Sequence, residues 1–185
     1  MTDASDRVIL DLCGGTGSWS APYREAGYDV RIIDIKGGQD VRLFEVPTCP
    51  IHGVLAAPDC THFAVSGARW WAEKGEQALL DALSLADACV RIVNTCKPAW
   101  WCLENPVGRL RRYHGAPVAT FDPCDYGDPY TKKTCLWGRF TMPEKHRVEP
   151  TEGSKMHRLP PSEDRKALRS VTPSGFARAF FEVNP

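Results

Sequence analysis

Short apolar runs that read as buried strands alternate with helical patterns along most of the chain. The run Val8–Leu12 leads into a glycine-rich turn and then into a segment of helical character, and the order of strand, loop and helix returns later. The predicted strands are 8–12, 30–35, 53–57, 99–103, 118–121 and 134–137, and the predicted helices are 18–26, 74–95 and 173–181. This alternation predicts an α/β fold, a mostly parallel sheet with crossover helices on both faces.

Residues 138–170 differ from the rest of the chain. They are rich in Pro, Glu, Lys, Arg and His and show little periodicity, which predicts loops. No internal repeat, low-complexity segment or linker divides the sequence. Because 185 residues suffice for one domain with a full core, we expect a single domain, 1–185, with a loop-rich insertion at 138–170.

The composition is typical of a soluble globular protein, with 43% hydrophobic and 25% charged residues. Lys plus Arg equals Asp plus Glu, at 23 each, so any nucleic-acid binding would have to rest on a local basic patch. The first residues lack the pattern of a signal peptide, and no apolar run reaches membrane-spanning length. We therefore expect a cytoplasmic protein without membrane contact.

Eight cysteines occur without a Cys-x-x-Cys pair, and most are expected to be buried free thiols in a reducing compartment. Cys49-x-x-His52 followed by Cys60-x-His62 comes nearest to a set of metal ligands. Because its spacing matches no zinc module, we expect no metal. A zinc-dependent nucleic-acid module stays as a weaker alternative.

The first chemically informative segment is Asp11-Leu-Cys-Gly-Gly-Thr-Gly17, called here the glycine loop, which follows a predicted strand and precedes a predicted helix. Glycine lets the backbone turn sharply and approach a ligand. Asp34, at the end of the next strand, can accept hydrogen bonds from ribose hydroxyls, and Asp40 could reach an adenine amino group. The loop matches neither Gly-x-Gly-x-x-Gly nor a phosphate loop, which favours S-adenosylmethionine over dinucleotides and nucleoside triphosphates. The alternative is a plain strand–helix turn.

The second such segment is residues 57–67, Ala-Pro-Asp-Cys-Thr-His-Phe-Ala-Val-Ser-Gly, called here the Cys60 loop, at the end of a predicted strand. Another predicted strand ends in Glu104-Asn105-Pro106. Methylation of cytosine at carbon-5 needs a thiolate that adds to carbon-6 and an acid that acts on ring nitrogen-3. A cysteine and a glutamate on one rim of a sheet could supply both.

These segments resemble motifs of the DNA (cytosine-5) methyltransferase family. The glycine loop is similar to the family's donor-binding motif, the Cys60 loop to its Pro-Cys loop, and Glu104-Asn105-Pro106 to its Glu-Asn-Val motif. Residues 125–134 resemble the part that ends in Gln-x-Arg-x-Arg, and residues 172–180 lie where the closing helix of the donor pocket is expected. The resemblance covers about residues 8–138, resumes near 169, and implies a Rossmann-like S-adenosylmethionine-dependent methyltransferase fold.

The resemblance also implies an activity: methyl transfer from S-adenosyl-L-methionine to carbon-5 of a flipped-out cytosine in DNA, through a covalent adduct with Cys60. Glu104 would act on ring nitrogen-3, and no metal is required. The implied donor-binding residues are Asp11, Cys13, Gly14, Gly15, Asp34, Ile35, Asp40, Val41 and Pro58. The implied substrate-binding residues are Thr61, Asn105, Arg109, Lys132 and Thr134.

The chain departs from the family pattern at three points. Asp59 stands where the family usually has a second proline, and an anion there would raise the pKa of Cys60 unless it is paired. Lys132 and Thr134 replace the two arginines of Gln-x-Arg-x-Arg. The region after Trp137 is much shorter than the family's target-recognition region, so residues 138–170 would form a minimal one. This implies a very short target sequence or help from a partner chain, and such a chain resembles phage-encoded members.

Three alternatives remain open besides the zinc module. The substrate could be an RNA cytosine, the group transferred to carbon-5 could be other than methyl, or the chain could bind DNA without turnover. Contacts with DNA would come from basic clusters, one at 109–114 and one at 132–147, which could equally be solvated surface. For Trp70 and Trp71 we expect a core position rather than a contact with DNA.

Overall fold

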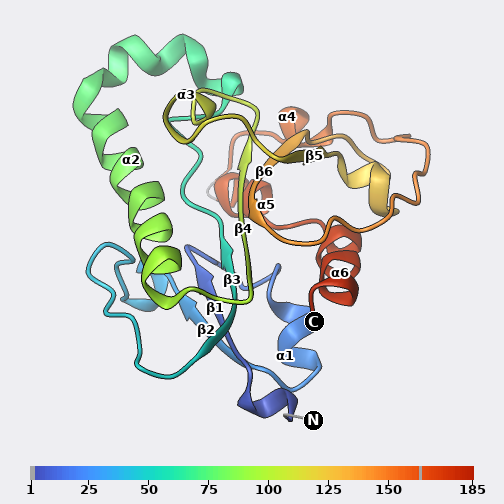
Figure 1. Cartoon of the computed structure of the whole chain (residues 1–185). Helices are drawn as coiled ribbons and strands as arrows, with labels where there is room; N and C mark the ends of the chain where they lie inside the picture. Colours follow the sequence, from blue (N-terminus) through green and yellow to red (C-terminus); the bar gives the residue numbers. More distant parts are fainter. Residues whose placement is uncertain (1–2, 163) are drawn as a thin grey trace.

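The computed structural model describes residues 3–162 and 164–185, and a six-stranded sheet of strand order β2-β1-β3-β4-β6-β5 forms its centre (Figure 1). The strands are β1 (Val8–Leu12), β2 (Asp29–Ile33), β3 (Ile51–Ala56), β4 (Trp100–Pro106), β5 (Ala119–Phe121) and β6 (Thr134–Arg139). Strands β1, β2, β3 and β4 run parallel to one another, whereas β6 is antiparallel to both β4 and β5. The predicted α/β fold with a mostly parallel sheet is confirmed.

Helices cover both faces of the sheet, as predicted. The helices are α1 (Ala21–Glu25), α2 (Trp71–Cys96), α3 (Arg111–His114), α4 (Lys155–Arg158), α5 (Arg165–Ser170) and α6 (Ser174–Val183). The long helix α2 lies on one side of the sheet, and α1 and α6 lie on the other (Figure 1). We call these two sides the α2 face and the α6 face.

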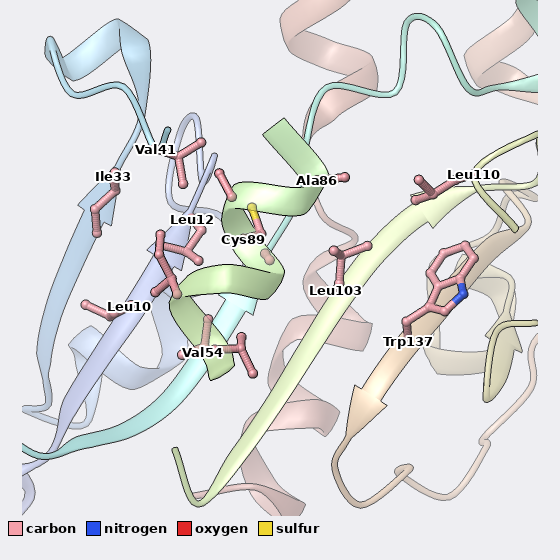
Figure 2. Packing of buried hydrophobic residues seen from close by; sticks show 14 of the residues in the cluster. Leu10, Leu12, Ile33, Val41, Val54, Ala86, Cys89, Leu103, Leu110 and Trp137 are labelled. Carbon is pink, nitrogen blue, oxygen red and sulfur yellow. The ribbon is translucent and has the colours of Figure 1, made fainter. Parts of the chain in front are cut away.

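Side chains of the central strands point alternately to the two faces, and because both faces are covered by helices the sequences of these strands are mostly apolar. On the α2 face, Leu10 and Leu12 of β1 pack with Val54 and with Cys89 of α2 (Figure 2). On the α6 face, Ile9 belongs to a second cluster that is rich in aromatic rings. The aromatic members of that cluster are Trp19, Tyr23, Tyr28, Trp100, Phe121, Tyr126, Phe176 and Phe180.

The element boundaries depart from the sequence prediction in ways that bear on function. β2 ends at Ile33, so Asp34 caps a short 3-10 helix at 35–37 instead of ending the strand. β4 continues to Pro106 because its last residues pair with β6, so Glu104 lies within the strand. In the insertion 138–170, where only loops were expected, α4 and α5 form two short helices. Within the described residues, no helix is both long and apolar enough to cross a membrane.

Candidate active site

Four strand ends meet at one edge of the sheet, and they carry the segments that the sequence singled out. Leu12 of β1 is in register with Ile33 of β2 and with Ala56 of β3, and Ala56 is in register with Leu103 of β4. The glycine loop, Asp34, the Cys60 loop and Glu104 therefore emerge side by side. The strand order reverses between β1 and β3, and the carboxyl ends of strands at such a reversal are the usual place for a ligand.

The glycine loop is held by bonds that need its glycines. The N–H of Cys13 donates to the Ile33 carbonyl at 2.7 Å, and the N–H of Gly15 donates to Asp34 Oδ2 at 2.9 Å. A Cβ on Gly14 would overlap the carboxyl group of Asp11. Gly15 has a φ of +55°, a backbone conformation that glycine adopts without strain and other residues rarely adopt. Cys13 has a similar φ of +56°. The loop thus packs closely over Asp11.

Asp11 is buried below this loop, with 1% of its surface exposed. Ser20 Oγ donates to its Oδ2 at 2.5 Å, and its Oδ1 has no hydrogen-bond partner among the described residues. Burial raises the pKa of Asp11 to about 6, against the opposing bond from Ser20, and the nearby Asp34 adds to the rise. A buried carboxylate oxygen without a partner is a place for an external donor group.

The other residues of the implied donor set differ in what they offer. Asp34 accepts from the N–H groups of Gly15 and Lys36, one to each oxygen, which leaves a lone pair on both. The side chain of Ile35 is 70% exposed beside it. Asp40 is engaged by Arg42 through a salt bridge of 2.5 Å. The Val41 side chain is buried in the core, so only its backbone could touch a ligand.

The Cys60 loop is fastened to the segment that follows Glu104. Asn105 Nδ2 donates to the carbonyl of Pro58 at 2.9 Å, and the N–H of Val65 donates to the carbonyl of Val107 at 2.9 Å. Ala64 and Gly108 form an isolated β-bridge, and a Cβ on Gly108 would overlap the carbonyl of Phe63. These contacts fix the loop against β4 and keep Cys60 near Glu104.

Cys60 is the one exposed cysteine of the eight, all of which lie in described residues and are free thiols. The residue is exposed to solvent on one side, while many protein atoms lie close to its thiol and reduce its contact with water. This burial raises the pKa of Cys60 to about 11, the carboxyls of Glu104 and Asp59 add to the rise, and Lys132 and Arg169 oppose it. The thiol is accessible, but it needs activation to ionise at neutral pH.

Glu104 projects to the α6 face next to Lys132. Burial raises the pKa of Glu104, and Lys132 opposes the rise, so the carboxyl stays protonated to a higher pH than usual and can donate a proton or a hydrogen bond. A small pocket lies here, lined by Glu104, Phe121, Lys132, Thr134, Thr172, Pro173 and Phe176. The predicted catalytic acid, Glu104, therefore lines the same pocket as two of the predicted substrate residues, Lys132 and Thr134.

The predicted substrate residues make internal contacts in this structure. Arg109 Nε donates to the carbonyl of His62 at 2.7 Å, and its guanidinium stacks on Trp71 at 4.3 Å. Lys132 Nζ donates to the carbonyl of Arg169 at 2.7 Å. Asn105 and Thr134 are buried, and Asn105 braces the Cys60 loop as described. Thr61 donates its N–H to Asp59 Oδ1 at 2.8 Å.

The tryptophans and basic clusters are placed differently from each other. The expected core position is wrong for Trp70, which is 46% exposed, and Trp71 is half-buried beneath Arg109. In the cluster at 109–114, Arg111, Arg112 and Tyr113 are exposed. In the cluster at 132–147, Lys145 and Arg147 form salt bridges with the buried Asp125, so much of their charge is already neutralised.

Helix α5 supplies contacts that the sequence did not indicate. Lys166 Nζ lies 2.8 Å from Asp59 Oδ2, and Arg169 Nη2 lies 3.4 Å from Ser66 Oγ. Both cations come from the insertion in which only loops were predicted, and no periodicity there could have indicated them. The one signal in the sequence was Asp59, an anion beside Cys60 that calls for a partner.

The cysteine and histidine pairs considered for zinc do not converge. The thiol of Cys49 contacts Arg31, and His52 Nε2 lies 2.7 Å from the carbonyl oxygen of Pro185. Across residues 3–162 and 164–185, no group of three or more metal-ligating side chains is present.

Comparison with known proteins establishes the fold. No family model matches the chain, and no curated protein sequence matches it. A solved structure from E. coli, described as a presumed DNA modification methyltransferase encoded within a prophage, matches it with a TM-score of 0.53 at 18% sequence identity. The match covers 85% of this chain and 49% of that one, so this chain spans about half of its length. The chain therefore shares the Rossmann-like α/β fold of that structure.

Proposed function

We propose that the chain is an S-adenosylmethionine-dependent DNA methyltransferase that modifies carbon-5 of cytosine through an adduct with Cys60. The observation that carries this proposal is the meeting of three parts at one sheet edge: the glycine loop, the exposed Cys60 and the carboxyl of Glu104. The similar prophage structure supports methyl transfer to DNA in general, and the choice of cytosine carbon-5 rests on the cysteine and the glutamate.

The residues at the glycine loop fit a methyl donor of this kind. Asp11 Oδ1 is buried without a partner among the described residues and could accept from an ammonium group. Asp34 keeps lone pairs for ribose hydroxyls, and the exposed Ile35 offers an apolar surface to an adenine ring. When bound, S-adenosylmethionine would supply an electrophilic methyl group.

Cys60 and Glu104 would divide the chemistry on the ring. The Cys60 thiolate adds to carbon-6 while Glu104, kept protonated by its raised pKa, hydrogen-bonds or protonates ring nitrogen-3. This makes carbon-5 nucleophilic enough to take a methyl group. Loss of the carbon-5 proton to a base and release of the thiol then complete the reaction. Asn105 contributes by holding the Cys60 loop through Pro58.

DNA would have to present a cytosine rotated out of the stack, at a cost of a few kcal/mol. The pocket beside Glu104 is small, so the segment that carries Thr172 and Pro173 would have to move for a base to enter. Exposed Arg111 and Arg112 are available for phosphates, which would make binding steeply salt-dependent. We further propose that 1–185 acts as one catalytic domain in the cytoplasm, with 138–170 as its target-recognition insertion.

One observation favours a second candidate, a DNA-binding protein without turnover. A thiol with a pKa of about 11 is almost wholly protonated at pH 7, so Cys60 would be inert unless substrate binding lowers its pKa. RNA cytosine and other carbon-5 groups also stay possible within the same geometry.

Trapping on modified DNA separates these candidates. With S-adenosylmethionine and duplex DNA that contains 5-fluorocytosine, the intact chain should form a covalent complex, because fluorine at carbon-5 blocks the final elimination. Cys60→Ser should form none while it still binds the donor. Equal trapping by the serine variant would refute the role of Cys60, and the absence of trapping by the intact chain would favour the non-catalytic candidate. Parallel RNA duplexes test the choice of nucleic acid.

A further inference from the structure

Helix α5 contacts the surroundings of Cys60 at three points. Lys166 pairs with Asp59, Arg169 Nη2 reaches Ser66 of the same loop, and the backbone carbonyl of Arg169 accepts from Lys132. One short helix of the insertion is thus joined both to the Cys60 loop and to the segment that follows β5. Docking of α5 and the arrangement of the site are therefore linked.

Asp59 is the point where this link bears on chemistry. One of its oxygens accepts from the N–H and hydroxyl of Thr61, and the other faces Lys166 at 2.8 Å. Lys166 is the one cation in a salt bridge with Asp59 among the described residues. Burial would raise the pKa of Asp59, but Lys166 and Thr61 outweigh it and the net pKa is lowered. The carboxylate directly before Cys60 is therefore charged and depends on Lys166 for neutralisation.

The charges that face Cys60 come from every element around it. Asp59 of its own loop and Glu104 of β4 disfavour a thiolate, whereas Lys132 and Arg169 favour it. Lys166 and Cys60 also act on each other. If α5 left its place, the Cys60 loop would lose its contacts with Lys166 and Arg169, and Asp59 would keep its charge.

We infer that Lys166 is a positioning residue for the nucleophile: it holds α5 on the Cys60 loop and cancels the Asp59 charge beside the thiol, so that docking of α5 sets the reactivity of Cys60. This inference rests on the proposed function for its purpose. Asp59 places a negative charge directly before Cys60, and Lys166 of the insertion 138–170 supplies the positive charge that compensates it.

The test is the rate at which iodoacetamide alkylates Cys60 in the full chain, followed peptide by peptide by mass spectrometry from pH 7 to 10. Lys166→Ala should slow alkylation at pH 8 about threefold, roughly half a pKa unit, because the lysine is exposed and partly screened by solvent. Lys166→Arg should keep the intact rate. In an Asp59→Asn background, Lys166→Ala should have a much smaller effect.

Lys155→Ala is the matched control, since this lysine pairs with Glu152 in the same insertion, and it should leave the Cys60 rate unchanged. The inference is overturned if Lys166→Ala leaves the rate unchanged, or if it slows alkylation equally in the intact chain and in the Asp59→Asn background. Alkylation requires neither donor nor DNA. A chain that shows this coupling but traps no 5-fluorocytosine DNA would lose only the proposed function, and one that traps DNA without the coupling would lose only this inference.

Discussion

Replacement of the buried Asp11 by asparagine should stabilise the fold relative to the intact chain, and this gain should be larger at neutral pH than at acid pH. The pKa of Asp11 is raised from 3.8 to about 6, and a shift of one unit corresponds to about 1.4 kcal/mol. Ionised Asp11 therefore costs the folded state about 3 kcal/mol when the pH is well above 6. Asparagine has the same shape, can still accept from Ser20, and carries no charge.

The sign follows from the raised pKa. The favourable contribution of protonated Asp11 is fully present below pH 3.8 and is lost as the pH rises through about 6. Most of that interval lies between pH 4 and pH 7.5, so the Asp11→Asn variant should gain about 2 kcal/mol on the intact chain over this range. Costs that do not depend on pH, such as a buried amide N–H without an acceptor, cancel in this comparison.

Urea denaturation of both chains at half-unit intervals from pH 4 to pH 7.5 measures the gain. Asp125→Asn is the matched control, because Asp125 is also a buried aspartate. Burial would raise the pKa of Asp125, but the Asp122 N–H, Lys145 and Arg147 outweigh it and the net pKa is lowered. Asp125→Asn should be less stable than the intact chain at neutral pH, and this difference should shrink only as the pH falls below 3.8. A difference between Asp11→Asn and the intact chain that stays constant from pH 4 to pH 7.5 would refute the reasoning.

Two further predictions concern the Cys60 loop and its chemistry. Gly108→Ala should lower the unfolding free energy by about 1–3 kcal/mol, because the added Cβ overlaps the Phe63 carbonyl; an unchanged urea midpoint would contradict this. Single-turnover methylation should vary little with pH between the raised pKa of Glu104 and about 11, the pKa of Cys60, because the protonated acid declines as the thiolate grows. In Glu104→Gln, which cannot titrate, the residual rate should instead rise about tenfold per pH unit from 7 to 9, and a flat profile there would argue against a Cys60 thiolate.

The sheet could be predicted because its central strands are buried on both faces. Short, mostly apolar runs such as Val8–Leu12 indicate buried strands when glycine-rich turns and helical patterns alternate with them. The register that aligns Leu12, Ala56 and Leu103 follows from parallel pairing. It also explains why segments distant in sequence meet at one edge, which local patterns could only suggest.

The contacts around the site could not be predicted, because they depend on where exposed side chains end up. The sequence suggests that Arg109 is free to bind a substrate, yet its side chain hydrogen-bonds to the carbonyl of His62 and stacks on Trp71. Lys166 lies in a segment without periodicity and pairs with a residue far away along the chain. Salt bridges between distant residues produce no local sequence pattern. A close backbone contact is easier to anticipate, because it often requires a glycine such as Gly108, and a glycine is visible in the sequence.

Burial raises the pKa of three acids at this edge, Asp11, Glu104 and Cys60. Each is therefore held toward its neutral form, and in the case of Asp11 and Cys60 a neighbouring carboxyl adds to the rise. Such a site favours the arrival of positive charge beside Asp11 and Cys60, because a nearby cation lowers the pKa of an acid. The proposed donor carries a sulfonium and an ammonium group. Its binding would thus ionise Asp11 and favour the Cys60 thiolate together, which reconciles a thiol that is inert by itself with its proposed role as the nucleophile.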